Sequence, residues 1–144
     1  MMKLLKFCVI LFSSFFASNL NAVEPENIMV IEVEGEANGV IEIELLPNIA
    51  PLHVERIKIL ARDEGYKRRY AGQGGSNYPD LDAEFSSIKY EEGTVGMARA
   101  QNPNSANSQF FIMFNRSPNL DGNYTVFGKV INGQEVVNSI KRGA

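Results

Sequence analysis

The sequence predicts a mostly β fold, an antiparallel barrel capped by two helices. Five short runs rich in β-branched and aromatic residues are separated by turns that contain Gly, Pro, Asn and Asp, a pattern typical of antiparallel strands. Two other stretches carry apolar residues at the spacing of an amphipathic helix. Many short strands with only two helices favour a closed, mostly antiparallel barrel.

The first two predicted strands form a hairpin. Residues 28–34 (IMVIEVE) and 40–45 (VIEIEL) flank a turn that contains two glycines. In the second run Ile41, Ile43 and Leu45 fall on one face and the glutamates on the other, which is the alternation of a strand with one buried face. Three further strands are predicted at residues 93–98, 109–114 and 124–131.

Two segments are predicted to be helices. In residues 52–63 the apolar positions recur at helical spacing, Pro51 suits the first turn, and Gly65 is a plausible stop. Residues 133–141 form the second predicted helix. His53 lies near the start of the first helix, and we expect it on the surface because histidine at such positions is mostly exposed.

The N-terminus has the organisation of a secretory signal peptide. Lys3 and Lys6 form a positive region, residues 7–17 are almost entirely apolar, and Ala22 is the small residue expected at a cleavage site. The alternative is a membrane anchor, but the apolar run is shorter than the roughly 20 residues that a spanning helix needs. The pattern therefore predicts cleavage and a periplasmic or secreted protein without stable membrane insertion.

The predicted mature chain, residues 23–144, is 122 residues long and suits a single domain. Loss of two lysines and no acid changes the net charge from −3 to −5, which argues against a nucleic-acid partner. Cys8 is the only cysteine and is removed with the signal; His53 is the only histidine. Disulfides, thiolate or multi-histidine metal sites and a Ser-His-Asp triad built elsewhere are therefore not expected.

One reaction needs neither a nucleophile nor a metal: rotation about an X-Pro bond, whose barrier of about 18–20 kcal/mol comes from amide resonance. A catalyst must bind the twisted form better than the planar one. That requires an apolar slot for the proline ring and polar groups for the backbone. Alternation in 109–114 places Gln109, Phe111 and Met113 on one face of a strand. This face could present such a slot, or Phe111 could be a core residue.

Three motifs resemble those of bacterial cyclophilins. They are 96–100 (GMARA), 102–112 (NPNSANSQFFI) and 120–130 (LDGNYTVFGKV), and the hairpin and first helix also resemble their family counterparts. The resemblance covers nearly all of the predicted mature chain. It implies a cyclophilin-like barrel, peptidyl-prolyl cis-trans isomerase activity without a cofactor, and proline-containing polypeptides as partners.

The resemblance also implies roles for individual residues. Phe111 and Leu120 would line the proline slot, and Gln109 would hold the substrate backbone. Ala98 and Arg99 would contact the residue that precedes the proline.

By the same resemblance, Tyr124 stands where other members carry a histidine or tyrosine on the rim of the slot. Asn119 departs from the family, because many members carry an aromatic residue there. Between the first helix and the glycine-rich loop, cyclophilins carry a Phe-His-Arg block and a Phe-Met-x-Gln block that residues 61–70 do not contain. The family's catalytic arginine is therefore absent from its usual context. Arg68 and Arg69 are possible substitutes, although they are more typical of a solvated loop.

The absent blocks would supply two strands and the catalytic arginine. We therefore expect a barrel incomplete by two strands, with open edges, and weakened isomerase activity in an exported folding helper. The alternatives are a proline-peptide-binding module without turnover and an inactive internal-deletion variant. The sequence identifies neither a particular substrate nor an oligomeric state.

Overall fold

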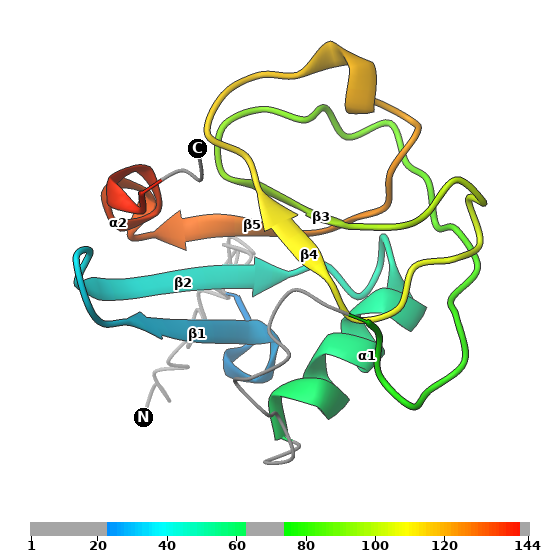
Figure 1. The fold of residues 1–144 in the computed structure, drawn as a ribbon, viewed down its shortest axis with the longest axis horizontal. Helices are drawn as coiled ribbons and strands as arrows, with labels where there is room; N and C mark the ends of the chain where they lie inside the picture. Colours follow the sequence, from blue (N-terminus) through cyan, green and yellow to red (C-terminus); the bar gives the residue numbers. More distant parts are fainter. Residues whose placement is uncertain (1–22, 63–73, 142–144) are drawn as a thin grey trace, which may run out of the picture.

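The computed structural model describes residues 23–62 and 74–141 (Figure 1). The predicted signal peptide, Gly65, Arg68 and Arg69 lie outside these residues. The described elements, in chain order, are η1 (Pro25–Asn27), β1 (Ile28–Val33), β2 (Gly39–Leu45), α1 (Pro51–Arg62), β3 (Thr94–Met97), β4 (Phe110–Ile112), η3 (Pro118–Leu120), β5 (Val126–Asn132) and α2 (Gln134–Ser139). All five predicted strands and both predicted helices are present, and the two short 3-10 helices were not predicted.

The strands form one antiparallel sheet in the order β1-β2-β5-β3-β4. In Figure 1 the sheet curls, so that β4 crosses the direction of β1 and β2 steeply. The described strands leave β1 and β4 as edges. The predicted mostly β, antiparallel fold with two helices is confirmed, and it is a curled half-barrel with open edges rather than the closed barrel that the strand pattern alone favoured.

One face of the sheet supplies the core. Ile41, Ile43 and Leu45 are buried along β2, whereas Glu42 and Glu44 between them point away from the core. The buried cluster continues through β3, β5 and both helices and includes Val54, Ile57, Val95, Met97, Phe127, Val136 and Val137. The predicted alternation is thus confirmed, and it determines the side on which the helices pack.

The start of α1 corrects the prediction for His53, which is fully buried rather than on the surface. The carboxylate of Glu84 accepts hydrogen bonds from the backbone N–H groups of Leu52 and His53, both at 3.1 Å. It also lies 2.7 Å from His53 Nδ1. The first N–H groups of a helix lack partners within the helix, and here a carboxylate from a distant loop satisfies two of them. The imidazole therefore lies inside the fold beside a carboxylate, rather than in solvent.

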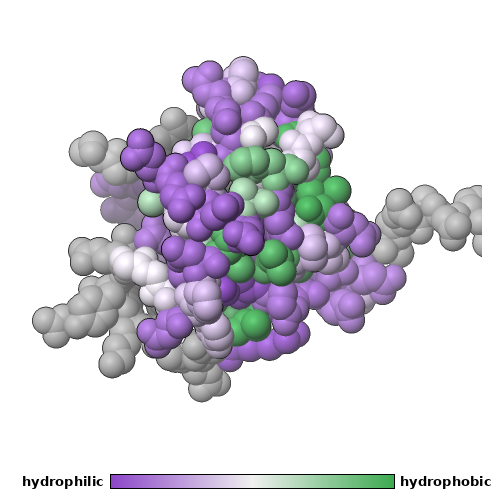
Figure 2. All heavy atoms as spheres, turned by 90° about the vertical axis from the view of Figure 1, so that its right-hand side faces the viewer, coloured by the Kyte–Doolittle hydropathy of each residue, from purple (hydrophilic) through white to green (hydrophobic). Residues whose placement is uncertain are grey.

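The surface is mostly hydrophilic with small apolar patches. Figure 2 shows hydrophobic side chains gathered near the middle of one face, surrounded by polar ones. Within the described ranges, no helix combines the length and apolarity needed to cross a bilayer.

Candidate active site

The pairing of β3 with β4 brings three of the predicted site residues together. Gly96 stands opposite Phe111 in the register, and the backbone N–H of Ala98 donates to the carbonyl of Gln109 at 2.8 Å. Ala98, the residue after β3, thus lies directly beside Gln109, the residue before β4. Residues that are more than ten positions apart in sequence become neighbours because an antiparallel ladder aligns them.

Phe111 is half-buried and lies outside the core cluster. Its ring stacks on Tyr90, with centroids 5.7 Å apart and planes at 25°. It also meets Tyr124 edge to face, with centroids 5.8 Å apart. Ile112 and Phe114 pack against the core instead. Phe111 therefore belongs to the face that does not fill the core, and with Tyr90 and Tyr124 it forms what we call the aromatic wall.

Arg99 extends the aromatic wall. Its guanidinium carbon lies 4.5 Å from the centroid of the Tyr124 ring, a distance suited to a cation–π contact. Its Nε and Nη2 atoms both donate to the carbonyl of Asn123, at 3.2 and 2.8 Å. Nη1 donates to the carbonyls of Ala100 and Gln101, at 2.9 and 3.3 Å. The guanidinium is therefore held in one orientation.

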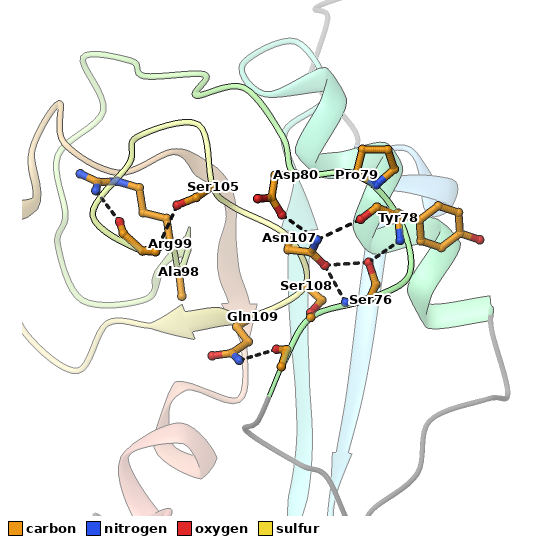
Figure 3. A pocket seen from close by; sticks show the side chains of 13 residues that line it. Ser76, Tyr78, Pro79, Asp80, Ala98, Arg99, Ser105, Asn107, Ser108 and Gln109 are labelled. Carbon is orange, nitrogen blue, oxygen red and sulfur yellow. Dashed lines mark hydrogen bonds between the residues drawn. The ribbon is translucent and has the colours of Figure 1, made fainter.

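A polar pocket of about 710 Å³ adjoins these residues (Figure 3). Ala98, Arg99 and Gln109 line one side, and residues of the segment 74–80 line the other. The Gln109 side-chain amide donates to the carbonyl of Gly74 at 2.9 Å and so joins the two sides. Phe111, Leu120 and Tyr124 do not line this pocket.

Asn107 holds the segment 74–80 in place. Its Oδ1 accepts from the backbone N–H and the hydroxyl of Ser76, at 2.6 and 2.7 Å. Its Nδ2 donates to the carbonyl of Tyr78 at 3.0 Å and to Asp80 Oδ1 at 2.9 Å. Figure 3 shows these bonds converging on one amide. We call Asn107 with the segment 74–80 the polar wall.

Arg56 supports the polar wall from α1. The side chain is buried, with 7% of its surface exposed. Nη1 donates to the carbonyl of Asn107 at 3.0 Å, and Nη2 to that of Pro79 at 2.7 Å. The guanidinium also lies 5.2 Å from the centroid of the Tyr78 ring. A buried cation needs such partners, since desolvation without them is costly.

Leu120 and Asn119 lie in η3, between β4 and β5. Leu120 is half-buried and Asn119 is exposed. The next residue, Asp121, is paired with Arg116 through two hydrogen bonds, and its Oδ1 accepts from the backbone N–H of Tyr90 at 2.9 Å. The Arg116 side-chain bond, with the Tyr90 N–H, lowers the pKa of Asp121 below its ordinary value. This pair connects η3 to the aromatic wall.

Sequence reasoning missed Tyr90, Asn107 and Arg56. Tyr90 lies in a segment without periodic pattern, and Asn107 is one polar residue among many in the stretch 99–108. Arg56 occupies a buried position of α1. A charged residue among the apolar positions of a helix is the sequence signal that could have indicated a buried polar contact. The described residues contain no cluster of three or more His, Cys, Asp or Glu side chains able to hold a metal ion.

The described residues thus form a curled antiparallel half-barrel with an aromatic wall beside a polar pocket. The family model described as "Cyclophilin type peptidyl-prolyl cis-trans isomerase/CLD" matches residues 28–144. The chain belongs to this family, and its enzyme class is that of the peptidyl-prolyl cis-trans isomerases.

Curated relatives agree with this assignment. A probable peptidyl-prolyl cis-trans isomerase of Brucella suis is 43% identical over 152 residues, which cover 86% of this chain and 76% of the relative. A peptidyl-prolyl cis-trans isomerase of Acinetobacter baylyi is 36% identical over 132 residues, covering 75% of this chain and 70% of that protein. The Brucella alignment is longer than the 144-residue chain, of which 86% is about 124 residues; about 28 aligned positions therefore have no counterpart here.

Solved structures support the fold. The cyclophilin AquaCyp293 from Hirschia baltica superposes with a TM-score of 0.72 at 23% identity, covering 84% of this chain and 70% of that one. A Cryptosporidium parvum cyclophilin-type isomerase, crystallised in the presence of the dipeptide Ala-Pro, gives a TM-score of 0.64 at 29% identity. That alignment covers 71% of this chain and 78% of the other.

Proposed function

We propose that this chain binds proline-containing segments of exported polypeptides and isomerises their X-Pro bonds slowly. The observation that carries the proposal is the half-buried Phe111 ring, held between Tyr90 and Tyr124 next to Ala98 and Gln109. An aromatic face supplies the apolar surface that a proline ring needs. The Cryptosporidium relative was crystallised in the presence of Ala-Pro, which supports a proline ligand for this architecture.

The polar pocket would receive the chain that precedes the proline. Ala98, Arg99 and Gln109 line it, and the Asn107 amide fixes its far side through four hydrogen bonds. A preorganised wall lowers the entropic cost of holding a peptide. With the backbone anchored there and the proline ring against Phe111, the intervening bond is the one free to twist. Better binding of the twisted form lowers the barrier.

The proposed slowness rests on the arginines. Arg56, Arg99 and Arg116 each direct the guanidinium at protein carbonyls or a carboxylate, which leaves these three poorly placed to donate to a prolyl nitrogen. We further propose that the positions without counterpart in the Brucella alignment include the family's arginine segment. Loss of one preorganised donor costs about 2.7–4 kcal/mol, or about 10²–10³ in rate.

The same observation favours a second candidate, a proline-peptide-binding module without turnover. The two differ only in rate, so the test is the isomerisation rate of a short Ala-Pro peptide with purified protein, measured beside a circular dichroism melt. Acceleration with a cooperative melt supports a slow isomerase. A cooperative melt without acceleration, but with peptide binding, supports the module. No melt and no binding would sink both and leave an inactive deletion variant.

A chimera tests whether the missing arginine segment limits the rate. Replacing residues 63–73 with the segment that joins the first helix to the glycine-rich loop in the Brucella suis relative should raise the rate by about 10²–10³. The same chimera with its transplanted arginine changed to lysine is the control. An equal rate in both chimeras would show that the arginine is not what this chain lacks.

Export is proposed from residues 1–22 alone, which carry the pattern of a signal peptide. Expression of the full chain in a bacterium, followed by fractionation and mass measurement, tests it. A periplasmic protein shortened by 22 residues is expected. Retention of the intact N-terminus in the cytoplasm would overturn it.

A further inference from the structure

Tyr90 is the one member of the aromatic wall that is completely buried. Its exposed fraction is 0%, and its hydroxyl has no hydrogen-bond partner within the described residues. Burial, with smaller contributions from Tyr124 and Asp121, raises the pKa of this hydroxyl well above its ordinary value, so it stays neutral. A buried hydroxyl without a partner adds nothing to the fold, so any role of Tyr90 must be explained by the contacts of its ring.

The contacts of Tyr90 indicate that explanation. Its ring lies against the ring of Phe111 at 5.7 Å and 25°, on the opposite side from any ligand, because Tyr90 is inaccessible. Tyr124 meets the edge of Phe111 at 5.8 Å. The Tyr90 ring therefore covers one face of the Phe111 ring and the Tyr124 ring meets it edge to face, so the two together restrict its orientation. No hydrogen bond can orient a phenyl ring, so these two contacts determine where its free face points.

Gly96 makes this arrangement possible. A Cβ atom at Gly96 would lie 2.6 Å from Phe111 Cζ and 2.6 Å from the Tyr90 hydroxyl oxygen. Real Cβ atoms do not approach other atoms so closely, and both rings are held in the interior of the wall. The strand position opposite Phe111 must therefore lack a side chain if the two rings are to stack directly. The missing side chain at Gly96 thus leaves the space in which the Tyr90 ring packs against Phe111.

We propose that Tyr90, seated over Gly96, is a positioning residue that orients Phe111 for the proline ring. It touches no substrate and acts only through Phe111. This inference rests on the proposed function, since it assumes that proline binds at Phe111. Stacked aromatic pairs contribute about 0.5–1.5 kcal/mol beyond burial, so Tyr90→Leu should weaken peptide affinity roughly three- to tenfold.

The test measures the affinity of a fluorescein-labelled Ala-Pro peptide, the isomerisation rate and thermal stability for three variants of the full chain. Tyr90→Leu should weaken binding and lower the rate. Tyr90→Phe keeps the ring and should retain wild-type affinity within about twofold. Ile57→Ala removes a buried side chain of α1 and serves as the stability control. It should lower the melting temperature and leave affinity unchanged at a temperature where it remains folded.

Equal affinity in wild type and folded Tyr90→Leu would overturn the proposal, as would equal losses in Tyr90→Leu and Ile57→Ala. If Tyr90→Leu does not fold, Gly96→Ala keeps the tyrosine ring and displaces it. That variant should bind less tightly, and adding Tyr90→Phe should recover part of the loss by removing one of the close atoms. If the effects of Gly96→Ala and Tyr90→Phe on affinity simply add, the two positions do not act together through Phe111 and the proposal is contradicted. Failure of the wild type itself to bind the peptide would instead refute the proposed function.

Discussion

The two walls of the candidate site are held by different forces. Asn107 fixes the polar wall through four hydrogen bonds that satisfy both ends of its amide. The aromatic wall depends on ring contacts around Phe111 and includes a buried hydroxyl that has no partner among residues 23–62 and 74–141. Hydrogen bonds are directional, whereas ring packing tolerates rotation. We therefore expect changes in the polar wall to affect stability together with binding, and changes in the aromatic wall to affect chiefly binding.

The largest effect on binding is expected for Phe111→Ala. The variant removes the apolar surface proposed for the proline ring, and burial of such a side chain contributes about 1.5–3 kcal/mol. Affinity for an Ala-Pro peptide should fall about 10- to 100-fold by fluorescence polarisation. The melting temperature should fall less than for a core residue, because Phe111 lies outside the core cluster.

Phe110→Ala is the matched control for that variant. Phe110 is the preceding residue of β4, is 38% exposed, and meets Phe127 edge to face at 6.2 Å. It points to the other side of the strand, so its loss should lower stability modestly and leave peptide affinity unchanged. Similar affinities for the two alanine variants would break the assignment of the slot to one face of β4.

Asn107→Ala tests the polar wall. Removal of the amide leaves the Ser76, Tyr78 and Asp80 groups without this partner, which should lower the free energy of unfolding by about 1–3 kcal/mol. Affinity should fall for peptides with several residues before the proline and remain nearly unchanged for the dipeptide. Urea titration and a peptide-length series measure the two effects.

Asn104→Ala provides the comparison within the same loop, because Asn104 Oδ1 accepts a single bond, from the backbone N–H of Ala83. It should cost less stability and leave the length dependence intact. If both asparagine variants behave alike, the polar wall has no special clamp at Asn107.

Sequence reasoning succeeded where a pattern is local. Alternation within 40–45 predicted the buried face of β2, and Pro51 marked the first residue of α1. It also placed Phe111 on a face separate from that of Ile112, which is where the structure has it. Each of these depends on the period of a strand or on the fixed backbone angle of proline, which the chain reveals without tertiary contacts.

The errors share another physical cause. His53 was expected on the surface, but its partner Glu84 is 31 residues away. Asn107 lies equally far from Ser76, and Tyr90 meets Phe111 only because β3 and β4 pair. Side-chain contacts between distant segments leave no periodic trace. The roles of the six residues implied by family resemblance remain predictions; the structure places Ala98, Arg99, Gln109, Phe111 and Tyr124 in one connected region.

Arg99→Gln probes the junction of the two walls. The side chain lines the polar pocket and covers the Tyr124 ring at 4.5 Å. A partly exposed cation–π contact contributes about 0.5–1 kcal/mol, so peptide affinity should fall about two- to fivefold. Because Tyr124 would lose one neighbour, the Tyr90→Leu effect should grow in this background. Unchanged affinity, measured by the same polarisation assay, would mean that the two walls act separately.

The smallest effect is expected at Asp121, whose Oδ1 accepts the backbone N–H of Tyr90 and thereby holds the base of the aromatic wall. The hydrogen bonds from the Arg116 side chain and the Tyr90 N–H lower the pKa of Asp121 below the ordinary aspartate value of 3.8. A carboxyl whose pKa is lower in the folded protein stabilises the fold above its unfolded pKa, and that contribution disappears as the pH falls through the folded pKa. Asp121→Asn should therefore melt slightly below wild type near neutral pH, and the two melting curves should converge below pH 3.8.

Ser117→Ala is the uncharged control. The backbone N–H of Ser117 donates to the Tyr90 carbonyl, and because the serine side chain carries no charge, this variant should shift the melting temperature equally at all pH values. A constant gap between Asp121→Asn and wild type down to acid pH would show that the charge of the Asp121 carboxylate contributes nothing to stability.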